Sequence, residues 1–240
     1  MIIERKRPFL SSARIILDDE LLGRAMREKD YAYITAISHN RFDLGADVSV
    51  KPKKTIGIRL QGKTIDELLQ SFNDTSRNEV RRTFGMSEIE VRVDTDPDAA
   101  YDLYMRFERA QGRTSQRKES FLQSKIWNAY LEGHLVSSIA CYDAKPILRI
   151  RAIYSERMWK ENKEKYQKIG FATKRLVYEI CKYGVENGYA LVDMGAANFT
   201  DPAKKGVTQF KSSFGGGVMD EYTYTYKSSL FRFISKFIRL

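Results

Sequence analysis

Cysteine, histidine and proline are scarce in this sequence, which has two, two and five of them among 240 residues. The cysteines and histidines are too few and too scattered to form a metal cluster or a disulfide scaffold. Cys141 lies in an expected strand and Cys181 on the apolar side of an expected helix. We therefore expect both to be reduced core residues, and no metal to be bound.

Long apolar runs are also missing. The first residues, M-I-I-E-R-K-R-P-F-L-S-S, lack the apolar stretch of about 7–15 residues that a secretory signal needs. No window approaches the roughly 20 apolar residues of a membrane-spanning helix. Hydrophobic residues make up 42% of the chain and aromatic residues 12%, which excludes a disordered protein. We expect a globular, cytoplasmic protein with a substantial core.

Positive charge is in excess, with 41 basic against 31 acidic residues and a formal net charge of +10. Such an excess favours an anionic partner. Nucleic acid, anionic lipid and a phosphate-bearing cofactor or substrate all satisfy this condition, and charge alone does not choose among them.

Apolar periodicity, capping residues and turn residues predict the order of the elements. A loop with a basic tip is expected over residues 39–54, and a charged surface connection over residues 155–168. The expected helices cover residues 18–28, 64–72, 76–84, 97–111, 121–130, 170–188 and 207–214, and the expected strands cover residues 31–38, 55–60, 87–93, 135–142, 147–154, 189–195 and 218–226.

The segment Gln167-x-x-Gly170-x-Ala172 stands where a loop is expected to become a helix. A residue without a side chain and one with a minimal side chain leave backbone N–H groups open at this point. Open N–H groups at the start of a helix bind anions. The segment is therefore a candidate site for a phosphorylated ligand.

A second candidate anion site lies on the helix expected over residues 76–84. Arg77 and Arg81 are four residues apart and so share one face. Two guanidiniums about a turn apart can hold a phosphate or carboxylate through forked hydrogen bonds. The alternative is a solvated basic face that pairs with Glu79.

Two further features have both a functional and a structural interpretation. Glu108 stands near a helix end, where its carboxylate opposes the helix dipole, so it is a candidate acid or base, or else an ion-pair partner of Arg109 or Arg113. Tyr222, Tyr224 and Tyr226 share one side of an expected strand. They could stack on bases, or they could pack within the protein.

The last residues form a basic amphipathic pattern. Arg232, Lys236 and Arg239 recur at helical spacing, and apolar residues oppose them. Such a helix could lie on an anionic membrane surface or dock on its own sheet as an ordinary terminal helix. Both interpretations remain open at this point.

The order of these elements resembles the GNAT acyltransferase fold, an α+β fold with a central mixed, mostly antiparallel sheet flanked by helices. The sequence looks most like the FemAB-type branch, which comprises peptidoglycan bridge aminoacyltransferases and relatives that acylate amino groups on envelope sugars. The resemblance covers roughly residues 55–226 and rests on T-S-R-N-E-V-R-R-T-F at 75–84, the glycine-led helix at 170–188, Y-A-L-V-D-M-G at 189–195, and G-V-T-Q-F-K-S-S-F-G at 206–215.

This resemblance divides the chain into three parts. Residues 1–70 would be a partial GNAT-like or accessory region, residues 71–227 the acyltransferase domain, and residues 228–240 the basic amphipathic helix. The bridge-forming enzymes are longer and contain two GNAT-like halves, so only a remnant of the first half fits before the domain. That departure favours a small donor, acetyl-CoA or another acyl-CoA, over tRNA.

The resemblance also implies a donor site. The pyrophosphate would sit on the N–H groups of Ile169 to Thr173, and the pantetheine arm would pair with the strand that ends R-A-I-Y. An N–H near Ile153–Ser155 would stabilise the oxyanion. The residues implied for the donor are Ile153, Tyr154, Ser155, Gln167, Ile169, Gly170, Phe171, Ala172 and Thr173.

Catalytic and acceptor residues follow from the same resemblance. Asp193 and Glu108 are the candidates to take the proton of the amine, although Asp193 could instead hold the nearby loop. Lys211 matches the F-K motif of the family and would contact donor or substrate, against the alternative of a solvated lysine at a helix rim. The residues implied for the amino-sugar acceptor and its phosphates are Arg77, Arg81, Asn198 and Tyr224.

The function implied is an N-acyltransferase that moves an acyl group, acetyl first of all, from acyl-CoA to an amino group of a nucleotide- or lipid-linked sugar. It would act in bacterial envelope polysaccharide synthesis, in the cytoplasm, where the terminal helix could keep it at the inner face of the membrane. The alternatives are an aminoacyl-tRNA-dependent FemAB-type transferase and a degenerate, non-catalytic GNAT binding module.

Overall fold

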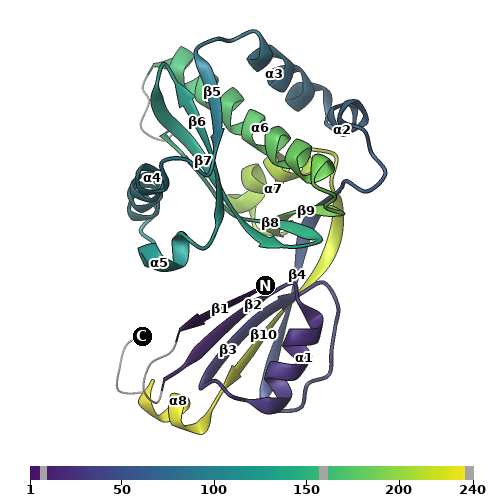
Figure 1. The fold of residues 1–240 in the computed structure, drawn as a ribbon, viewed down its shortest axis with the longest axis vertical. Coiled ribbons are helices and arrows are strands. Elements are labelled where there is room, and N and C mark those ends of the chain that lie inside the picture. Colours follow the sequence, from purple (N-terminus) through teal and green to yellow (C-terminus); the bar gives the residue numbers. More distant parts are fainter. Residues whose placement is uncertain (6–9, 157–161, 236–240) are drawn as a thin grey trace.

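The computed structural model describes residues 1–5, 10–156 and 162–235, and the elements form two lobes (Figure 1). The small lobe combines the start of the chain with its end. It contains β1 (Ile2–Arg5), β2 (Ser12–Ile16), α1 (Asp19–Glu28), β3 (Tyr33–Ser38), the first half of β4 (Val48–Arg59), the second half of β10 (Gly217–Lys227) and α8 (Ser229–Ile234).

The large lobe holds the remaining elements. They are α2 (Ile65–Ser71), α3 (Asp74–Phe84), β5 (Ile89–Val93), α4 (Pro97–Ala110), α5 (Lys118–Phe121), β6 (Lys125–Leu131), β7 (His134–Ala144), β8 (Ile147–Ser155), α6 (Lys163–Glu186), β9 (Leu191–Ala197) and α7 (Lys205–Ser212). The long α6 packs on β6, β7 and β9, and α3 packs on α6 (Figure 1).

The described strands join in one ten-stranded sheet, in the order β1-β2-β3-β10-β4-β9-β8-β7-β6-β5. Neighbouring strands are antiparallel except for the pairs β2/β3 and β8/β9. The predicted fold class, a mixed and mostly antiparallel sheet flanked by helices, is therefore confirmed.

Two continuous strands and an apolar contact join the lobes. β4 and β10 pair along their whole length, from Gly57 opposite Gly217 to Val48 opposite Tyr226, and so pass through both lobes. Between the lobes, three isoleucines of the small lobe pack on two residues of β7 in the large lobe, and the cluster is Ile3, Ile16, Ile37, Tyr142 and Ala144. The opposite face of the small lobe is covered by α1, where Tyr222, Tyr224 and Tyr226 lie together as expected.

Several elements differ from those that the sequence predicts, which include neither β1 nor β2. β4 begins at Val48, inside the expected loop, because β10 pairs with these exposed residues. The apolar residues 121–130 fit a buried strand as well as the expected helix, and they form mainly β6 between β5 and β7. The helix expected from Gly170 begins at Lys163, where the Asn162 side chain accepts hydrogen bonds from the N–H groups of Glu164 and Lys165.

The described part of the tail docks on the protein. The ring of Phe231 in α8 stacks on that of Tyr33, with the centroids 4.8 Å apart. Lys236, Phe237 and Arg239 of the predicted amphipathic helix lie outside the described residues, as do residues 157–161 of the predicted surface connection. Among the described helices, none has the length and apolar character needed to cross a membrane. Cys141 and Cys181 are free and fully buried, as expected.

Candidate active site

The centre of the large lobe is a place where two parallel strands separate. β8 and β9 pair at three positions, the last of which joins Arg149 to Asp193. Both strands bulge just beyond this pair, since Arg151 has no partner on β7, and Met194 with Gly195 lies opposite the single residue Ile56 on β4. Within the described residues, no strand pairs with the β9-facing edge of β8 beyond Arg149. Two strand edges therefore face each other across an open space.

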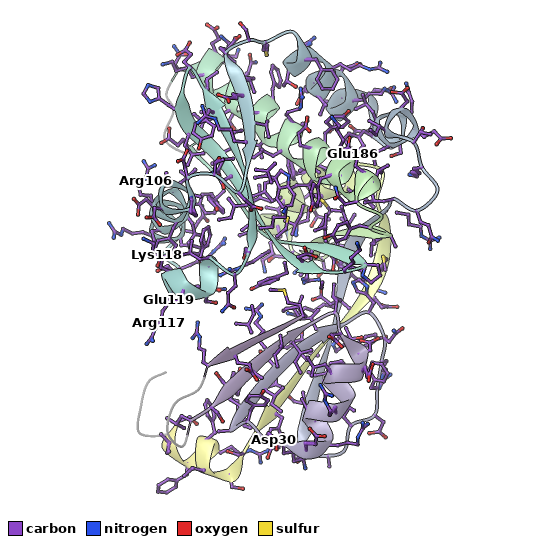
Figure 2. All side chains as sticks on the ribbon, in the orientation of Figure 1. Asp30, Arg106, Arg117, Lys118, Glu119 and Glu186 are labelled. Atoms are coloured by element: carbon purple, nitrogen blue, oxygen red, sulfur yellow. The ribbon has the colours of Figure 1, made fainter. Side chains whose placement is uncertain are left out.

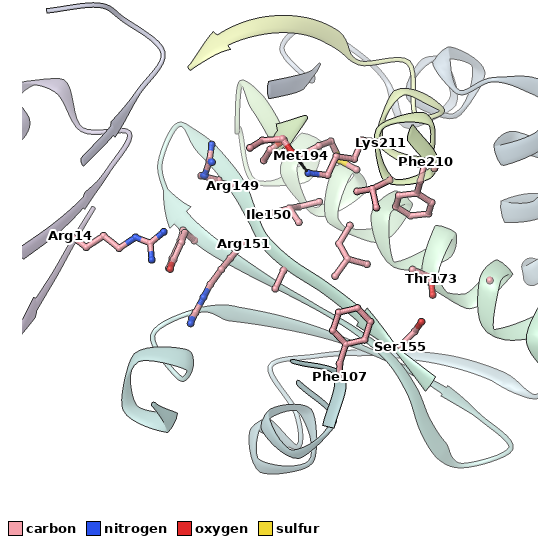
Figure 3. Close-up of a pocket in the computed structure, with 18 residues that line it drawn as sticks. Arg14, Phe107, Arg149, Ile150, Arg151, Ser155, Thr173, Met194, Phe210 and Lys211 are labelled. Carbon is pink, nitrogen blue, oxygen red and sulfur yellow. Dashed lines mark hydrogen bonds between the residues drawn. The ribbon is translucent and has the colours of Figure 1, made fainter. Parts of the chain in front are cut away.

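A cavity of about 550 Å³ fills this space. Figure 3 shows that one end is basic and the other mostly apolar. Arg14 from β2 reaches the basic end beside two arginines of β8, and the apolar end is lined by residues of α4, α6, α7 and β8. The residues that define the two ends are Arg14, Arg149 and Arg151, and Phe107, Ile153, Ser155, Thr173 and Phe210.

Lys211 in α7 lies between the two ends (Figure 3). Its ammonium donates hydrogen bonds to the carbonyl oxygens of Gly195, at 3.1 Å, and Ala196, at 2.7 Å. Gly195 has φ +74°, and the Ile150 carbonyl oxygen lies 3.0 Å from where a Cβ would stand, so a glycine is required here. Burial, and to a smaller extent the charge of Arg149, lowers the pKa of Lys211 to about 8.

A buried ion cluster holds the strands together beside the cavity. Arg149 pairs with Asp193 and also with Glu221 of β10, where Nη2 lies 2.7 Å from Oε2. Asp193 also accepts hydrogen bonds from the Thr55 hydroxyl and the Gly195 N–H, and its Oδ2 lies 3.0 Å from the His39 ring nitrogen. Residues from four strands and the end of β3 therefore meet at one guanidinium and two carboxylates.

The cluster fixes the charge of its members. Burial would raise the pKa of Asp193, but the charge of Arg149 and the three hydrogen-bonding neighbours outweigh it and hold that pKa well below its usual range. Burial would lower the pKa of Arg149, but Asp193 and Glu221 together raise it. Both residues are therefore ionised at neutral pH and tied to one another.

A second cavity of about 460 Å³ lies between the lobes and shares Arg14 with the first. Its lining combines hydroxyl groups with cationic side chains, and it includes Arg5, Ser12, Thr35, Lys53, Ser120 and Thr223. Arg117 at the start of α5 projects toward the small lobe at the rim of this region (Figure 2). The lining of the cavity between the lobes therefore carries three cationic side chains, Arg5, Arg14 and Lys53.

The structure brings some of the predicted donor residues to the cavity and not others. Ile153, Ser155, Gly170 and Thr173 line it. The N–H groups of residues 169–173 belong to the interior of α6 and are used in the helix, so the open anion-binding turn predicted there does not exist. The remaining predicted donor residues point elsewhere: Ile169, Ala172 and Tyr154 into the core, and Gln167 to solvent, with Phe171 half-buried outside the cavity lining.

The predicted acceptor residues lie away from the cavity. Arg77 donates to the carbonyl oxygens of Gln70 and Phe72 and pairs with Asp74, so it ties α3 to the end of α2, and Arg81 is exposed on the same helix. The other two are held by structural contacts: the Asn198 side chain accepts hydrogen bonds within its own loop, and the buried Tyr224 hydroxyl donates to the carbonyl oxygen of Asn40 and accepts from the N–H of Phe42.

Neither predicted carboxylate lines the cavity. Asp193 belongs to the ion cluster, and Glu108 lies 3.7 Å from Arg113, the ion pair that was its alternative interpretation. The sequence interpretation missed the residues of the basic end and of the cluster, above all Arg14, Tyr142, Arg149, Arg151 and Glu221. One signal was available, since I-L-R-I-R-A-I-Y places two arginines in an apolar strand, where charge is costly unless it is paired or functional.

Comparison with known proteins gives structural matches only. No protein-family model and no curated protein matches the sequence. The structure is similar to that of FemX, with a TM-score of 0.64, 13% identity, and coverage of 100% of this chain and 86% of FemX. It is also similar to the C-terminal domain of a putative lysylphosphatidylglycerol synthetase from Agrobacterium fabrum, with a TM-score of 0.58, 11% identity, and coverage of 98% and 84%.

A third structure, L-PGS from Bacillus licheniformis, matches with a TM-score of 0.52, 14% identity, and coverage of 99% of this chain and 85% of that one. The chain therefore shares the fold of these three proteins, which confirms the FemAB-like, GNAT-type fold that the resemblance predicted from the sequence. The match to FemX extends over the small lobe as well as the large one, since it covers the whole chain.

Proposed function

We propose that this protein transfers an acyl group from an activated ester or thioester to the amino group of a sugar. The observation that carries the proposal is the separation of β8 and β9 after Arg149 and Asp193, which opens a cavity with a polar edge on either side. Lys211 stands between an apolar end and a basic end of that cavity. The fold shared with FemX supports the same reaction class.

The acyl donor enters from the apolar end. An extended arm with amide groups can pair with the open edge of β8 as an added strand, past Ile153 and Ser155. Phe107 and Phe210 offer apolar surface for methylene groups, and Gly170 and Thr173 close that end from α6. The pantetheine arm of an acyl-CoA has this chemistry, which supports acyl-CoA as the donor.

The reaction itself joins one bond and breaks another. The lone pair of the amine attacks the carbonyl carbon of the donor, and the carbonyl oxygen takes up negative charge. Lys211, which is charged at neutral pH, and a backbone N–H near Ile153–Ser155 stabilise that oxygen. The carbon–sulfur bond then breaks, and the proton that the amine loses passes through water to the departing thiolate.

Asp193 acts in this scheme as a positioning residue, because its carboxylate is committed to Arg149. Glu108 could act as the base only if its ion pair with Arg113 opens. Transfer of the proton through water avoids this requirement. The acceptor enters between the lobes, where hydroxyl and cationic side chains suit a phosphate-linked sugar of the bacterial envelope.

A second candidate donor is an aminoacyl-tRNA, and a specific observation favours it. The N–H groups that were expected to hold the pyrophosphate of CoA are inside α6. An aminoacyl ester needs no such site, and the positive charge between the lobes suits a nucleic acid. The attack of the amine on the carbonyl carbon is the same for both donors, but with the tRNA ester a carbon–oxygen bond breaks and the proton passes to the ribose oxygen that leaves.

A thermal-shift experiment separates these donors, since binding to the folded state alone raises the apparent stability, by about 2.7 kcal/mol at a hundredfold excess over Kd. Acetyl-CoA, a longer acyl-CoA and charged tRNA are compared. We expect a saturable shift with acyl-CoA. A shift with charged tRNA alone, which decreases steeply as salt is added, would establish aminoacyl-tRNA as the donor. No shift with any donor would favour the alternative of a non-catalytic binding module.

Two matched glycine variants locate the donor. A Cβ at Gly206 or at Gly217 meets nothing within 4 Å, so both sites accept a side chain, but only Gly206 lines the cavity. Gly206→Phe is expected to abolish the donor-induced shift, whereas Gly217→Phe retains it. An equal effect of the two variants would place the donor elsewhere.

A further inference from the structure

The basic end of the cavity holds two guanidiniums without a counter-charge. Within the described residues, no Asp or Glu oxygen lies within 4.0 Å of Arg14 or Arg151. Arg151 donates only to neutral oxygens, namely the Ser120 carbonyl at 3.0 Å, the Phe121 carbonyl at 3.4 Å, the Ser124 hydroxyl at 2.8 Å and the Gln116 side chain. A positive charge that is taken out of water and not neutralised is costly. Two such charges in one cavity suit an anionic ligand.

Tyr142 lies beside both of these cations. The Arg14 guanidinium carbon lies 5.6 Å from the centre of the Tyr142 ring, and that of Arg151 lies 5.3 Å from it. The ring therefore attracts both cations, while the cations repel each other. The charges of Arg14 and Arg151 are held near one another by the aromatic ring and not by a carboxylate.

The Tyr142 hydroxyl gives independent evidence of a missing partner. Tyr142 is 1% exposed and lines the cavity, and its hydroxyl makes no hydrogen bond. Buried polar atoms in folded proteins nearly always have a partner, because leaving one unpaired costs the free energy of its hydration. A ligand oxygen beside the two guanidiniums would accept this hydrogen bond.

Backbone geometry aims Arg151 at the same place. The β7/β8 register passes from Ala140 opposite Ala152 to Cys141 opposite Ile150, so Arg151 is the extra residue of a β-bulge. Bulges bend a strand and redirect a side chain, and they recur beside active sites. Burial lowers the pKa of Arg151, and the charge of Arg14 acts in the same direction. A bound anion would relieve both effects.

We propose that Arg14, Arg151 and Tyr142 form a subsite for an oxyanion that the acceptor carries beside its amino group. This inference rests on the proposed function, because it assigns the acceptor of the same cavity. The acceptor is then an acidic amine, namely an amino sugar with a phosphate or a carboxylate, and not a neutral amino sugar. The anion fixes the register of the sugar, so that its amine faces Lys211 and the donor.

Binding of three amino sugars tests the subsite. Glucosamine, glucosamine 6-phosphate and 2-amino-2-deoxyglucuronic acid are titrated into the full chain by calorimetry, at constant ionic strength. We expect at least one acidic sugar to bind tenfold or more tightly than glucosamine. The phosphate and carboxylate arms identify the group that is recognised. Equal affinities, or no saturable binding of either acidic sugar, would overturn the proposal.

Variants assign the preference to these residues. Arg14→Gln removes one charge from a half-buried site without an ion pair, and we expect it to reduce the preference for the acidic sugar at least tenfold. Tyr142→Phe removes only the unpaired hydroxyl, and we expect a three- to tenfold loss with an unchanged Tm. Arg24→Gln, on the exposed face of α1, is the matched control and keeps the full preference.

The same variants separate this inference from the proposed function. The donor-induced thermal shift is measured for Arg14→Gln and Tyr142→Phe, since neither residue lies at the apolar end. A retained donor shift with a lost acid preference supports the subsite. A retained donor shift with an unchanged preference overturns the subsite and leaves acyl transfer intact. If no donor shifts the melting temperature of the unmodified chain, the proposed function is overturned instead.

Discussion

Arg149 and Arg151 stand two residues apart in β8, yet their surroundings are opposite. Arg149 faces two buried carboxylates, Asp193 and Glu221, which leave its charge more than neutralised. Arg151 faces neutral oxygens and a second arginine, Arg14, across an aromatic ring. The same residue type in the same strand therefore belongs to the framework in one case and to a ligand site in the other.

The presence or absence of a counter-charge decides the role of each arginine. When the carboxylates are present, removing the arginine leaves them unpaired in the interior. When no carboxylate is present, the arginine is neutralised only by a bound anion, and removing it relieves repulsion between cations in the free protein. Stability and binding measurements should therefore respond in opposite ways to substitutions around Arg149 and around Arg151.

The largest effect is expected from Arg149→Met. This change leaves Asp193 and Glu221 buried without their cation, and breaking a buried ion pair in this way costs about 3–5 kcal/mol. Urea unfolding measures the loss. Arg14→Met, which removes a cation without a counter-charge, is the control and should change the free energy of unfolding by less than about 0.5 kcal/mol. An equal loss of unfolding free energy in the two variants would contradict the different roles assigned to the two arginines.

Lys211→Met is expected to lower kcat/KM by about a hundredfold, which corresponds to roughly 2.7 kcal/mol of transition-state stabilisation. The free energy of unfolding should change little, since loss of the hydrogen bonds to Gly195 and Ala196 is offset by removal of a buried charge near Arg149. Steady-state kinetics with the donor found by thermal shift measures the effect. Lys205→Met, on the exposed part of the same helix, is the control. An unchanged rate would exclude Lys211 from the reaction.

A pair of hydroxyl deletions sharpens the comparison within the cluster. Thr55→Val removes a hydrogen bond to the Asp193 carboxylate and should cost about 1.5–3 kcal/mol, because that bond is made to a charged group. Thr223→Val removes a buried hydroxyl that makes no hydrogen bond and should be close to neutral. Both changes keep the shape of the side chain. Similar unfolding free energies for the two variants would contradict the role given to the cluster.

The smallest effect concerns pH. Lys211 acts in its charged form, and its pKa is about 8, so kcat/KM should fall about tenfold per pH unit above that value. Lys211→Arg keeps its charge, so the ratio of its rate to that of the unmodified chain should rise above pH 8, and this ratio cancels ionisation of the acceptor. A ratio that stays flat from pH 7 to 9.5 would mean that the charge of Lys211 does not act in the reaction.

The same pKa affects stability with a defined sign. The pKa of Lys211 is about 8 in the folded chain against an ordinary 10.5, so the unfolded chain holds this proton more tightly. The penalty on the fold is therefore full below pH 8 and is relieved as the pH rises toward 10.5. The difference in unfolding free energy between the unmodified chain and Lys211→Met reports it.

Local signals in the sequence were enough for much of the fold. Thr64 and Glu67 form a capping box at the start of the helix expected over 64–72, and Pro97 opens α4, expected over 97–111. β7 and β8 contain the two strands expected over 135–142 and 147–154. Lys211 lines the cavity, and its contact with donor or substrate stays a prediction. In each case the information lies within a few residues of the chain.

The remainder of the site depends on contacts between distant parts of the chain. Arg149 and Asp193 are 44 residues apart, and Glu221 belongs to a third strand. Nothing local pairs them, so each appeared in the sequence as an isolated charge. The start of α6 was missed because the glycine at position 170 suggested a turn, whereas the Asn162 cap had already begun the helix. Packing of α6 on the sheet overrides the local preference.

Because β4 and β10 pass through both lobes, the sheet of the small lobe can form only after β10 has been synthesised. β3 pairs with β2 and β10, and the first half of β4 pairs with β10, which follows the elements of the large lobe in the sequence. The sheet of the small lobe therefore cannot close before the large lobe has been synthesised. Such long-range pairing is slow, and the large lobe can assemble most of its own strands first. Arg14 lies on β2, which is connected to β4 only through β3 and β10, so its place at the cavity depends on this long-range pairing.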